Sequence, residues 1–331
     1  HLRPRRQRQM CIRDRITSDA SLHYFRINQR VTYMCGIVGL FLKDHSLQNQ
    51  LGQLLSQMLI TMSDRGPDSA GVAIYGEPAN TESKITIQSD KQSKDFETLE
   101  SILREKLDER LDISFKDTHA VIRANNTKIK FILELIENYI PRARVMSVGS
   151  SIEIYKETGM PSSVIDRFSI HKMKGSHGIG HTRMATESEV TTLGAHPFST
   201  APDECLVHNG SLSNHNNLRR NLVRDGIKIE TENDSEIAAA YLTNQMSDGA
   251  TLGEALEKGL EDLDGFFTFV VGTKRGFGVL RDPVACKPAV MAETDQYVAF
   301  GSEYRALVDL PNITQAKIWE PEPSTVYFWT Q

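Results

Sequence analysis

The sequence predicts an α+β fold in which antiparallel strands and helices form separate layers. Two observations lead to this prediction. Four short apolar runs follow one another closely over residues 266–301, which is typical of antiparallel strands joined by tight turns. Apolar residues recur at helical spacing over residues 47–62 and 95–111, which predicts amphipathic helices that cover a sheet.

In the first half of the chain, short apolar runs predict strands, and apolar residues repeated every three or four positions predict helices. The run GIVGLFL at residues 36–42 predicts a buried strand, and the helix after it ends at the breaker cluster Ser-Asp-Arg-Gly-Pro of residues 63–67. Further strands are expected over residues 71–75, 84–88, 119–124 and 145–155, and a further helix over residues 128–138.

In the second half, two short strands over residues 178–183 and 205–210 end in polar residues. Helices are expected over residues 214–224, 234–246 and 251–262, and strands over residues 266–272, 276–280, 288–292 and 296–301. The sequence shows no repeat, low-complexity tract or long linker, which favours one domain with an internal excursion at about residues 78–175.

Composition excludes several classes of protein. The chain has 331 residues, 39% of them hydrophobic and 24% charged, which is typical of a globular protein. No run approaches the roughly 18 apolar residues of a membrane helix. Four cysteines without a CxxC pair exclude a disulfide scaffold and argue against a cysteine zinc site. Neither GxGxxG nor a P-loop is present, so no cofactor and no metal are expected.

Charge separates the start of the chain from the rest. Residues 1–33 carry a net charge of +6, so the remaining residues carry −11 of the formal total of −5. Such an acidic body is not expected to bind nucleic acid. A basic start can indicate a nucleic-acid arm or a transit peptide. The run HLRPRRQRQMCIRDR instead resembles translated sequencing adapter, so we expect residues 1–34 to be a non-native or removed extension, with a cleaved propeptide as the alternative.

Six polar clusters coincide with the ends of predicted strands or the start of a helix, where site residues are common. Each alone is a weak signal, since Asn-Gly is a frequent turn and Asp234 could cap a helix. The clusters are Cys35-Gly36-Ile37, Arg65-Gly66-Pro67-Asp68-Ser69, Gly180-His181-Thr182-Arg183, Ala195-His196-Pro197-Phe198, Val207-His208-Asn209-Gly210 and Asn233-Asp234-Ser235-Glu236.

Taken together and in this order, these motifs resemble those of the class II glutamine amidotransferases, which are N-terminal nucleophile (Ntn) hydrolases. The resemblance covers nearly everything after Met34. Its motifs are MCGIVG (34–39), RGPDSAG (65–71), GIGHTRMAT (178–186), HPF (196–198), VHNG (207–210), NDSE (233–236), RDP (281–283) with KP (287–288), and GSEYRAL (301–307).

The resemblance implies a four-layer αββα sandwich over residues 35–331, with the excursion at about 78–175 inserted in it. The segments TRMATES and VHNGSLSNHN look most like stand-alone subunits related to the glutaminase part of glutamate synthase. One such subunit is the amidotransferase-like subunit of N-methylglutamate synthase. The long excursion also favours that branch.

The resemblance also implies how glutamine would be hydrolysed. Cys35 would be the nucleophile after removal of Met34, and its own α-amine, with an ordinary pKa near 7.7–8.0, would be the base. Asn209 and Gly210 would form the oxyanion hole, through a side-chain amide and a backbone N–H. The alternatives are a core cysteine and a plain Asn-Gly turn.

Four further residues would hold the substrate. Arg183 would bind the α-carboxylate of glutamine and Asp234 the α-ammonium, with a surface ion pair and a helix cap as the alternatives. Thr186 and His196 are weaker candidates for substrate contacts, while His181 and His208 are expected to be structural. The family often has Trp, His and Gly where this chain has Met184, Glu187 and Ala285, which concerns the loops around glutamine rather than the nucleophile.

The expected partners follow from the same resemblance. The 24 residues after GSEYRAL are too few for a synthase domain, so glutamate-synthase-like partner subunits on separate chains are expected to receive the ammonia. No membrane or nucleic-acid partner is expected, and the location is expected to be cytoplasmic. Two other functions stay open: a non-catalytic regulatory or scaffold subunit with the same fold, and an Ntn hydrolase that cleaves another γ-glutamyl amide.

Overall fold

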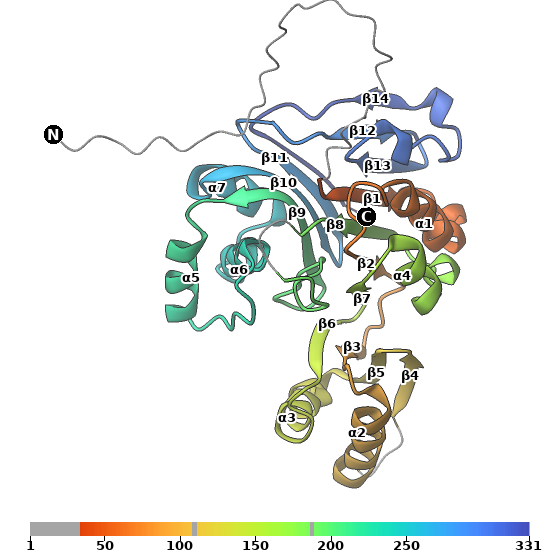
Figure 1. The fold of residues 1–331 in the computed structure, drawn as a ribbon, viewed down its shortest axis with the longest axis vertical. Helices are drawn as coiled ribbons and strands as arrows, with labels where there is room; N and C mark the ends of the chain where they lie inside the picture. Colours follow the sequence, from red (N-terminus) through yellow and green to blue (C-terminus); the bar gives the residue numbers. More distant parts are fainter. Residues whose placement is uncertain (1–33, 108–110, 186–188, 331) are drawn as a thin grey trace, which may run out of the picture. The chain divides into compact units, whose positions relative to one another are not determined.

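The structure is a computed structural model that describes residues 34–107, 111–185 and 189–330 (Figure 1). The largest sheet has seven antiparallel strands in the order β14-β12-β13-β1-β8-β2-β7. Its strands are β1 (Gly36–Leu42), β2 (Ser69–Tyr75), β7 (Ile152–Thr158), β8 (His177–Arg183), β12 (Val290–Glu293), β13 (Tyr297–Gly301) and β14 (Lys317–Trp319). Because β1 is the middle strand of this sheet, Cys35, directly before it, lies at a central position in the fold.

A four-stranded antiparallel sheet packs against the first, in the order β15-β11-β10-β9. Its strands are β9 (Glu204–Leu212), β10 (Gly265–Thr273), β11 (Gly276–Arg281) and β15 (Thr325–Thr330). The apolar core between the two sheets contains Ile37 and Phe41 from β1, together with Val207, Val270 and Phe277 from the second sheet.

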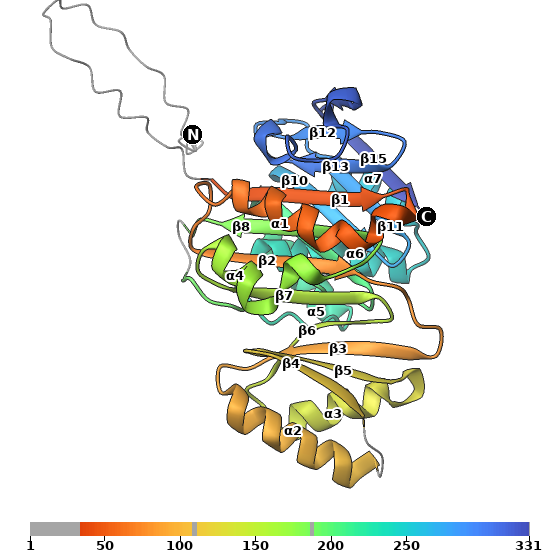
Figure 2. The same ribbon diagram turned by 90° about the vertical axis from the view of Figure 1, so that its right-hand side faces the viewer.

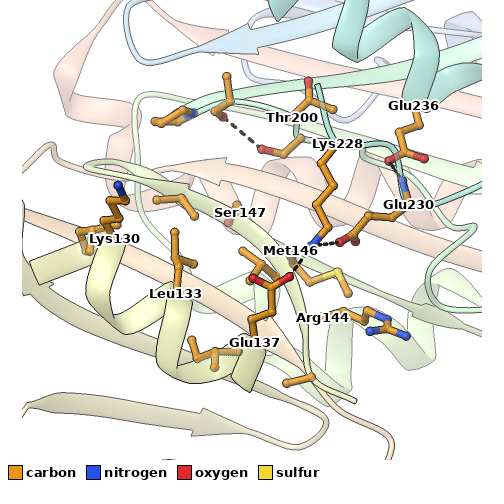
Figure 3. Close-up of a pocket in the computed structure, with 18 of the residues that line it drawn as sticks. Lys130, Leu133, Glu137, Arg144, Met146, Ser147, Thr200, Lys228, Glu230 and Glu236 are labelled. Atoms are coloured by element: carbon orange, nitrogen blue, oxygen red, sulfur yellow. Dashed lines mark hydrogen bonds and ion pairs between the residues drawn. The ribbon is translucent and has the colours of Figure 1, made fainter. Parts of the chain in front are cut away.

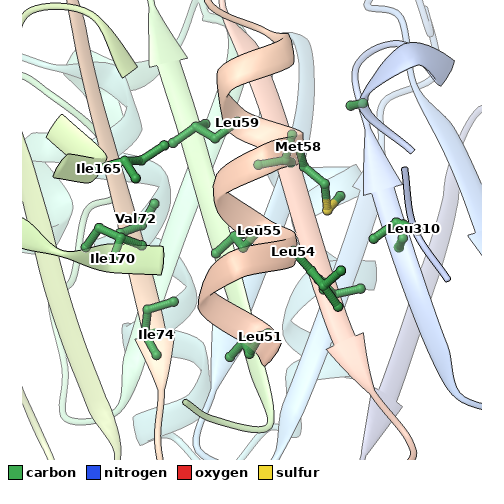
Figure 4. Close-up of a cluster of buried hydrophobic side chains, with 14 of the residues drawn as sticks. Leu51, Leu54, Leu55, Met58, Leu59, Val72, Ile74, Ile165, Ile170 and Leu310 are labelled. Carbon is green, nitrogen blue, oxygen red and sulfur yellow. The ribbon is translucent and has the colours of Figure 1, made fainter. Parts of the chain in front are cut away.

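Helices cover the outer face of each sheet. The alternate side chains of β1, Val38 and Leu40, lie on the opposite face from Ile37, in the apolar core that α1 covers. Figure 4 shows Leu55 and Leu59 of α1 in this core. On the far side, Leu206 and Phe269 contact the apolar face of α6. The helices are α1 (Leu51–Thr61) and α4 (Pro161–Phe168) on the first sheet, and α5 (His215–Arg224), α6 (Asp234–Ser247) and α7 (Leu252–Asp262) on the second. The predicted four-layer αββα sandwich is confirmed.

A third sheet forms a separate α/β unit that is inserted between β2 and β7 (Figure 2). It consists of β3 (Glu82–Gln88), α2 (Gln92–Leu107), β4 (Asp112–Lys116), β5 (His119–Asn125), α3 (Ile129–Tyr139) and β6 (Arg144–Gly149). The strand order β4-β5-β3-β6 and the βαββαβ connection are those of ferredoxin-like folds. We call residues 82–149 the inserted unit. The range 78–175 expected from the sequence also contains β7 and α4, which belong to the sandwich.

The single strand predicted over residues 145–155 is wrong. The chain breaks at Ser150 and Ser151 into β6 and β7, which belong to different sheets. The carboxylate of Asp203 accepts hydrogen bonds from the backbone N–H groups of Ser150, Ser151 and Ile152, at 2.8 to 3.1 Å, and from both serine hydroxyls. The loop that carries Asp203, about 50 residues later in the sequence, therefore stabilises the break between β6 and β7.

The remaining differences concern short or half-exposed elements. The helix predicted over residues 47–62 starts at Leu51, after a 3-10 turn at His45–Gln50, and the helix predicted over 95–111 is α2. Strands β4, β14 and β15 and helix α4 were not predicted. Further 3-10 turns lie at Asn126–Lys128, Ile170–Lys172, Tyr304–Ala306 and Ile313–Gln315. Among the described residues, no helix has the length and apolar character needed to cross a membrane.

Candidate functional site

The two sheets bring Cys35 and Asn209 together. Cys35 lies directly before β1, and Asn209 lies in β9 of the other sheet. The side-chain amide of Asn209 donates to the carbonyl oxygen of Cys35 at 3.1 Å, and Nε of Arg65 donates to the same oxygen at 3.2 Å. Three of the six polar clusters thus meet at one carbonyl group.

The Cys35 thiol lies in a partly buried position. Its Sγ is 3.9 Å from the carbonyl oxygen of Met184, to which it donates a weak hydrogen bond. Burial raises the pKa of the Cys35 thiol, although the positive charges of Arg183, Lys287 and Arg65 act in the opposite direction. The thiol is therefore protonated at neutral pH and needs a base to become a nucleophile.

Gly210 has a backbone conformation that suits glycine. Its φ of +151° lies in a region that other residues rarely adopt, and an added Cβ would collide with the Phe266 carbonyl oxygen in the neighbouring β10. Asn209, with 3% of its surface exposed, and Gly210 are therefore held in a close-packed strand pair beside Cys35.

Arg183 ends β8 and is 7% exposed. Its guanidinium group donates to the Glu189 carbonyl oxygen at 3.4 Å. The backbone around it is held by Asp68, whose N–H donates to the Arg183 carbonyl oxygen at 3.1 Å and whose carboxylate accepts from Ala185 N at 2.8 Å. The RGPDS motif thus supports the segment that carries Arg183. Thr186 lies outside the described residues.

Asp234 begins α6, and its carboxylate accepts a hydrogen bond from Leu212 N at 2.8 Å. The side chain of Asp234 keeps 22% exposure. The helix cap belongs to its neighbour Asn233, whose side chain accepts from Ser235 N at 2.9 Å. Because capping is carried out by Asn233, the helix-cap alternative for Asp234 does not describe this structure.

Ser235 joins two buried histidines, a role that the sequence analysis missed. Its hydroxyl lies 2.8 Å from Nε2 of His196 and 2.9 Å from Nδ1 of His208. His181 stacks on His196 with ring centroids 4.0 Å apart, and its Nε2 contacts the His208 carbonyl oxygen at 3.1 Å. His196, expected as a substrate contact, is 5% exposed and belongs to this network.

Burial keeps these three histidines neutral near pH 7. It lowers the pKa of His181 to about 3, that of His196 well below its usual range, and that of His208 in the same direction, with Asp234 acting against the shift at His208. Among the described residues, no group of three or more His, Cys, Asp or Glu side chains could hold a metal ion.

Lys156 supports the loop that carries His196. Its buried ammonium group donates to the carbonyl oxygens of Leu193, Ala195 and Pro197 at 3.2, 2.7 and 3.2 Å. Burial lowers the pKa of Lys156 to about 7. No local signal indicates this role, because Lys156 lies in β7, about forty residues before the loop.

The loop after β11 carries Lys287, whose positive charge acts on the Cys35 thiol. Asp282 holds the loop by accepting from Val284 N at 3.0 Å and Ala285 N at 3.2 Å. Ala285 has a φ of +49°, in the left-handed region that favours glycine. This conformation suits the glycine expected here from the resemblance, and in this chain an alanine adopts it.

Comparison with known proteins gives consistent results. The family model of the glutamine amidotransferase domain matches residues 181–309. The chain is 64% identical to the glutamine amidotransferase-like protein GlxB of Rhizobium meliloti, over 89% of this chain and 98% of that protein. It is 34% identical to a putative glutamine amidotransferase of Methanothermobacter thermautotrophicus, over 89% of this chain and 99% of that one.

Two solved structures share the fold. One is the glutamine phosphoribosylpyrophosphate amidotransferase from B. subtilis, with a TM-score of 0.57 and 18% identity. The other is described as the allosteric regulatory enzyme of purine biosynthesis, with a TM-score of 0.59 and 18% identity. Each match covers 89% of this chain and 47% of the solved chain, so this chain spans about half the length of both.

Proposed function

The chain belongs to the class II glutamine amidotransferase family, and we propose that it hydrolyses the side-chain amide of glutamine and delivers the ammonia to a partner synthase subunit. The observation that carries this proposal is the 3.1 Å contact between the Asn209 amide and the Cys35 backbone. It places a hydrogen-bond donor next to Cys35, whose thiol is also under the influence of the positive charges of Arg183 and Lys287.

In the proposed reaction, Cys35 Sγ attacks the amide carbon of glutamine, the C–N bond breaks, and ammonia leaves with the proton that the base took from the thiol. Water then hydrolyses the γ-glutamyl thioester to glutamate and restores the thiol. Since burial raises the pKa of the thiol, a base must take its proton. The α-amine of Cys35 suits this role once Met34 is removed, because a free α-amine has an ordinary pKa near 7.7–8.0. A peptide-bonded nitrogen at Cys35 is an amide and cannot accept the proton.

The oxyanion of the tetrahedral intermediate would be stabilised by Asn209 Nδ2 and Gly210 N–H. In the structure Asn209 Nδ2 already donates to a carbonyl oxygen, the same kind of acceptor that the substrate presents. Both donors belong to β9, which is paired along its length with β10, so they are positioned before the substrate arrives.

Glutamine itself would be held by charges of opposite sign. Arg183 would bind the α-carboxylate and Asp234, at the start of α6, the α-ammonium, with Thr186 and His196 as further contacts. The neutral state of His196 suits a hydrogen-bonding role beside the positive charge of the substrate. His196 would also position Ser235, and through it the first turn of α6.

Ammonia is protonated in water and then loses its nucleophilicity, which favours direct transfer to a docked partner. We expect that partner to be a glutamate-synthase-like subunit on a separate chain. The isolated chain should therefore show low glutaminase activity that rises when its partner subunits are added.

Glutaminase assays of two proteins test the mechanism. The full 331-residue chain should be inactive, whereas a chain that begins at Met34 should release ammonia from glutamine after aminopeptidase trimming exposes Cys35. N-terminal sequencing and intact mass identify the active species. Equal activity of both proteins, with residues 1–34 still attached in the first, would exclude the α-amine as the base. Cys35→Ala in the shorter chain is the matched inactive control.

A further inference from the structure

A large cleft separates the inserted unit from the sandwich (Figure 3). Its volume is about 860 Å³, within the range of roughly 300–1,000 Å³ typical of small-molecule sites. One wall consists of α3 and β6 of the inserted unit, and the other of residues 199–202 and the segment from Lys228 to Glu236. Ligand sites are frequent at such boundaries between structural units.

The wall on the inserted unit is largely apolar. Leu133 and Ile136 of α3 and Met146 of β6 line it, and Pro202 lines the opposite wall. Val145, also in the cleft, keeps 38% of its surface exposed. This surface could bury the apolar body of a ligand.

Two basic side chains in the cleft can bind an anion. Three basic side chains, Lys130, Arg144 and Lys228, line it together with three carboxylates, those of Glu137, Glu230 and Glu236. Glu137 and Glu230 share Lys228, at 3.1 and 3.5 Å, and Glu236 accepts from backbone N–H groups. Among the described residues, no ion pair involves Lys130 or Arg144, and Arg144 donates only to the Pro141 carbonyl oxygen, so these two side chains are available to an anionic group.

Lys228 bridges the two walls, and the bridge is weak. Figure 3 shows its side chain reaching from the sandwich wall to Glu137 on α3. The side chains of Lys228 and Glu137 are 72% and 71% exposed, and ion pairs this exposed contribute little to stability. An incoming anion therefore competes for Lys228 with the weakly held carboxylates of Glu137 and Glu230.

The same segment leads directly to the glutamine pocket. The carboxylate of Glu236 accepts from Glu230 N at 2.7 Å and from Thr231 N at 2.6 Å. Glu236 lines the cleft, yet it lies one residue after Ser235 and two after Asp234. Movement of Lys228 and Glu230 would thus be transmitted to the start of α6.

We propose that this cleft binds a small molecule with an apolar body and an anionic group, and that its binding changes the affinity of the adjacent pocket for glutamine. The second half rests on the proposed function, because it requires that Asp234 binds glutamine.

The aromatic sulfonate 8-anilino-1-naphthalenesulfonate serves as the probe for the site, in fluorescence titrations of the full chain. We expect saturable binding to one site. Lys228→Ala and Arg144→Ala should each weaken it about tenfold, whereas Lys258→Ala, an exposed lysine on α7, should not. Ala201→Trp should block the cleft, and Ala250→Trp, outside it, is the matched control. Thermal melting verifies folding. Binding that is absent, or equal in all variants, would overturn the site.

Calorimetric titration of glutamine into the Cys35→Ala chain tests the coupling, because this variant cannot turn glutamine over. With the probe at saturation, the Kd for glutamine should change about fivefold. An unchanged Kd would show that binding in the cleft does not affect glutamine binding, and would leave the binding site itself uncontradicted. If glutamine does not bind with or without the probe, the proposed function is contradicted, and the regulatory half with it.

Discussion

The amide of Asn209 and the carbonyl group of Cys35 lie in hydrogen-bond contact across 174 residues of sequence and between two sheets. Asn209→Ala should lower glutaminase turnover by a factor of roughly 10²–10³, because the oxyanion exists only near the transition state. The KM for glutamine should change little. Steady-state kinetics of the trimmed chain measure both values. Intact turnover combined with weakened glutamine binding would show that Asn209 is a substrate-binding residue instead.

Arg183→Lys should have the opposite kinetic signature. Lysine keeps the positive charge but loses the planar fork that matches a carboxylate, so KM for glutamine should rise about tenfold or more, with a smaller fall in turnover. The same kinetic assay measures this. A variant that loses turnover at unchanged KM would contradict the assignment of Arg183 to the α-carboxylate.

Ser235→Ala should destabilise the protein, because it leaves His196 Nε2 and His208 Nδ1 buried without their shared partner. We expect a loss of about 2 kcal/mol in the free energy of unfolding, measured by urea denaturation. Ser247→Ala, at the exposed end of the same helix, is the control and should stay within about 0.5 kcal/mol. Equal effects of the two substitutions would show that the contacts of Ser235 with the two histidines contribute nothing to stability.

Ala285→Gly should stabilise the protein. Alanine at a φ of +49° has a steric cost that glycine lacks, and this outweighs the greater flexibility of glycine in the unfolded chain. The gain should be about 0.5–1 kcal/mol in urea denaturation. Ala316→Gly, at a φ of −69°, has no such relief and should be destabilising. A loss of stability in both variants would show that the backbone of Ala285 is not strained.

His119→Phe should reduce the sensitivity of the fold to acid. Burial against Phe168 and Tyr155 lowers the pKa of His119 to about 3. Between this value and the unfolded pKa near 6.5, the unfolded state binds more protons, so the free energy of unfolding falls as the pH falls. From pH 7 to pH 5, the natural protein should lose about 2 kcal/mol more than the variant. Equal losses in urea denaturation at the two pH values would show that His119 titrates normally in the fold.

Much of the sandwich could be predicted from short-range pattern. The unbroken apolar run before Leu42 indicated a buried central strand, and helix α7 begins with the capping box of Thr251 and Glu254. Strand ends that carry polar clusters indicated where the site residues lie. These signals are local, because side-chain periodicity and capping depend on neighbours within a few positions.

Other features were decided only by the tertiary structure. Nothing near Ser150 in the sequence indicates that the strand breaks there, since the break is held by Asp203, which lies directly before β9. The ferredoxin-like strand order of the inserted unit depends on which strands pair. Strand β4 has too few buried residues to be recognised as a strand from the sequence.

The hydrogen bonds that support the candidate site were also decided only by the tertiary structure. Cys35, Arg183, Asn209 and Asp234 could be named from motifs together with an expected role. Ser235 lies in one of those motifs, but its role, like that of Lys156, could not be predicted. Their partners, two histidine rings and three carbonyl groups, belong to segments far away in the sequence. The sequence alone indicated most strands of the sandwich and the residues proposed to carry chemistry, because those properties belong to side chains and their close neighbours. Which of them meet, and the cleft beside them, were decided by burial and hydrogen bonding between distant segments, which exist only in the folded chain.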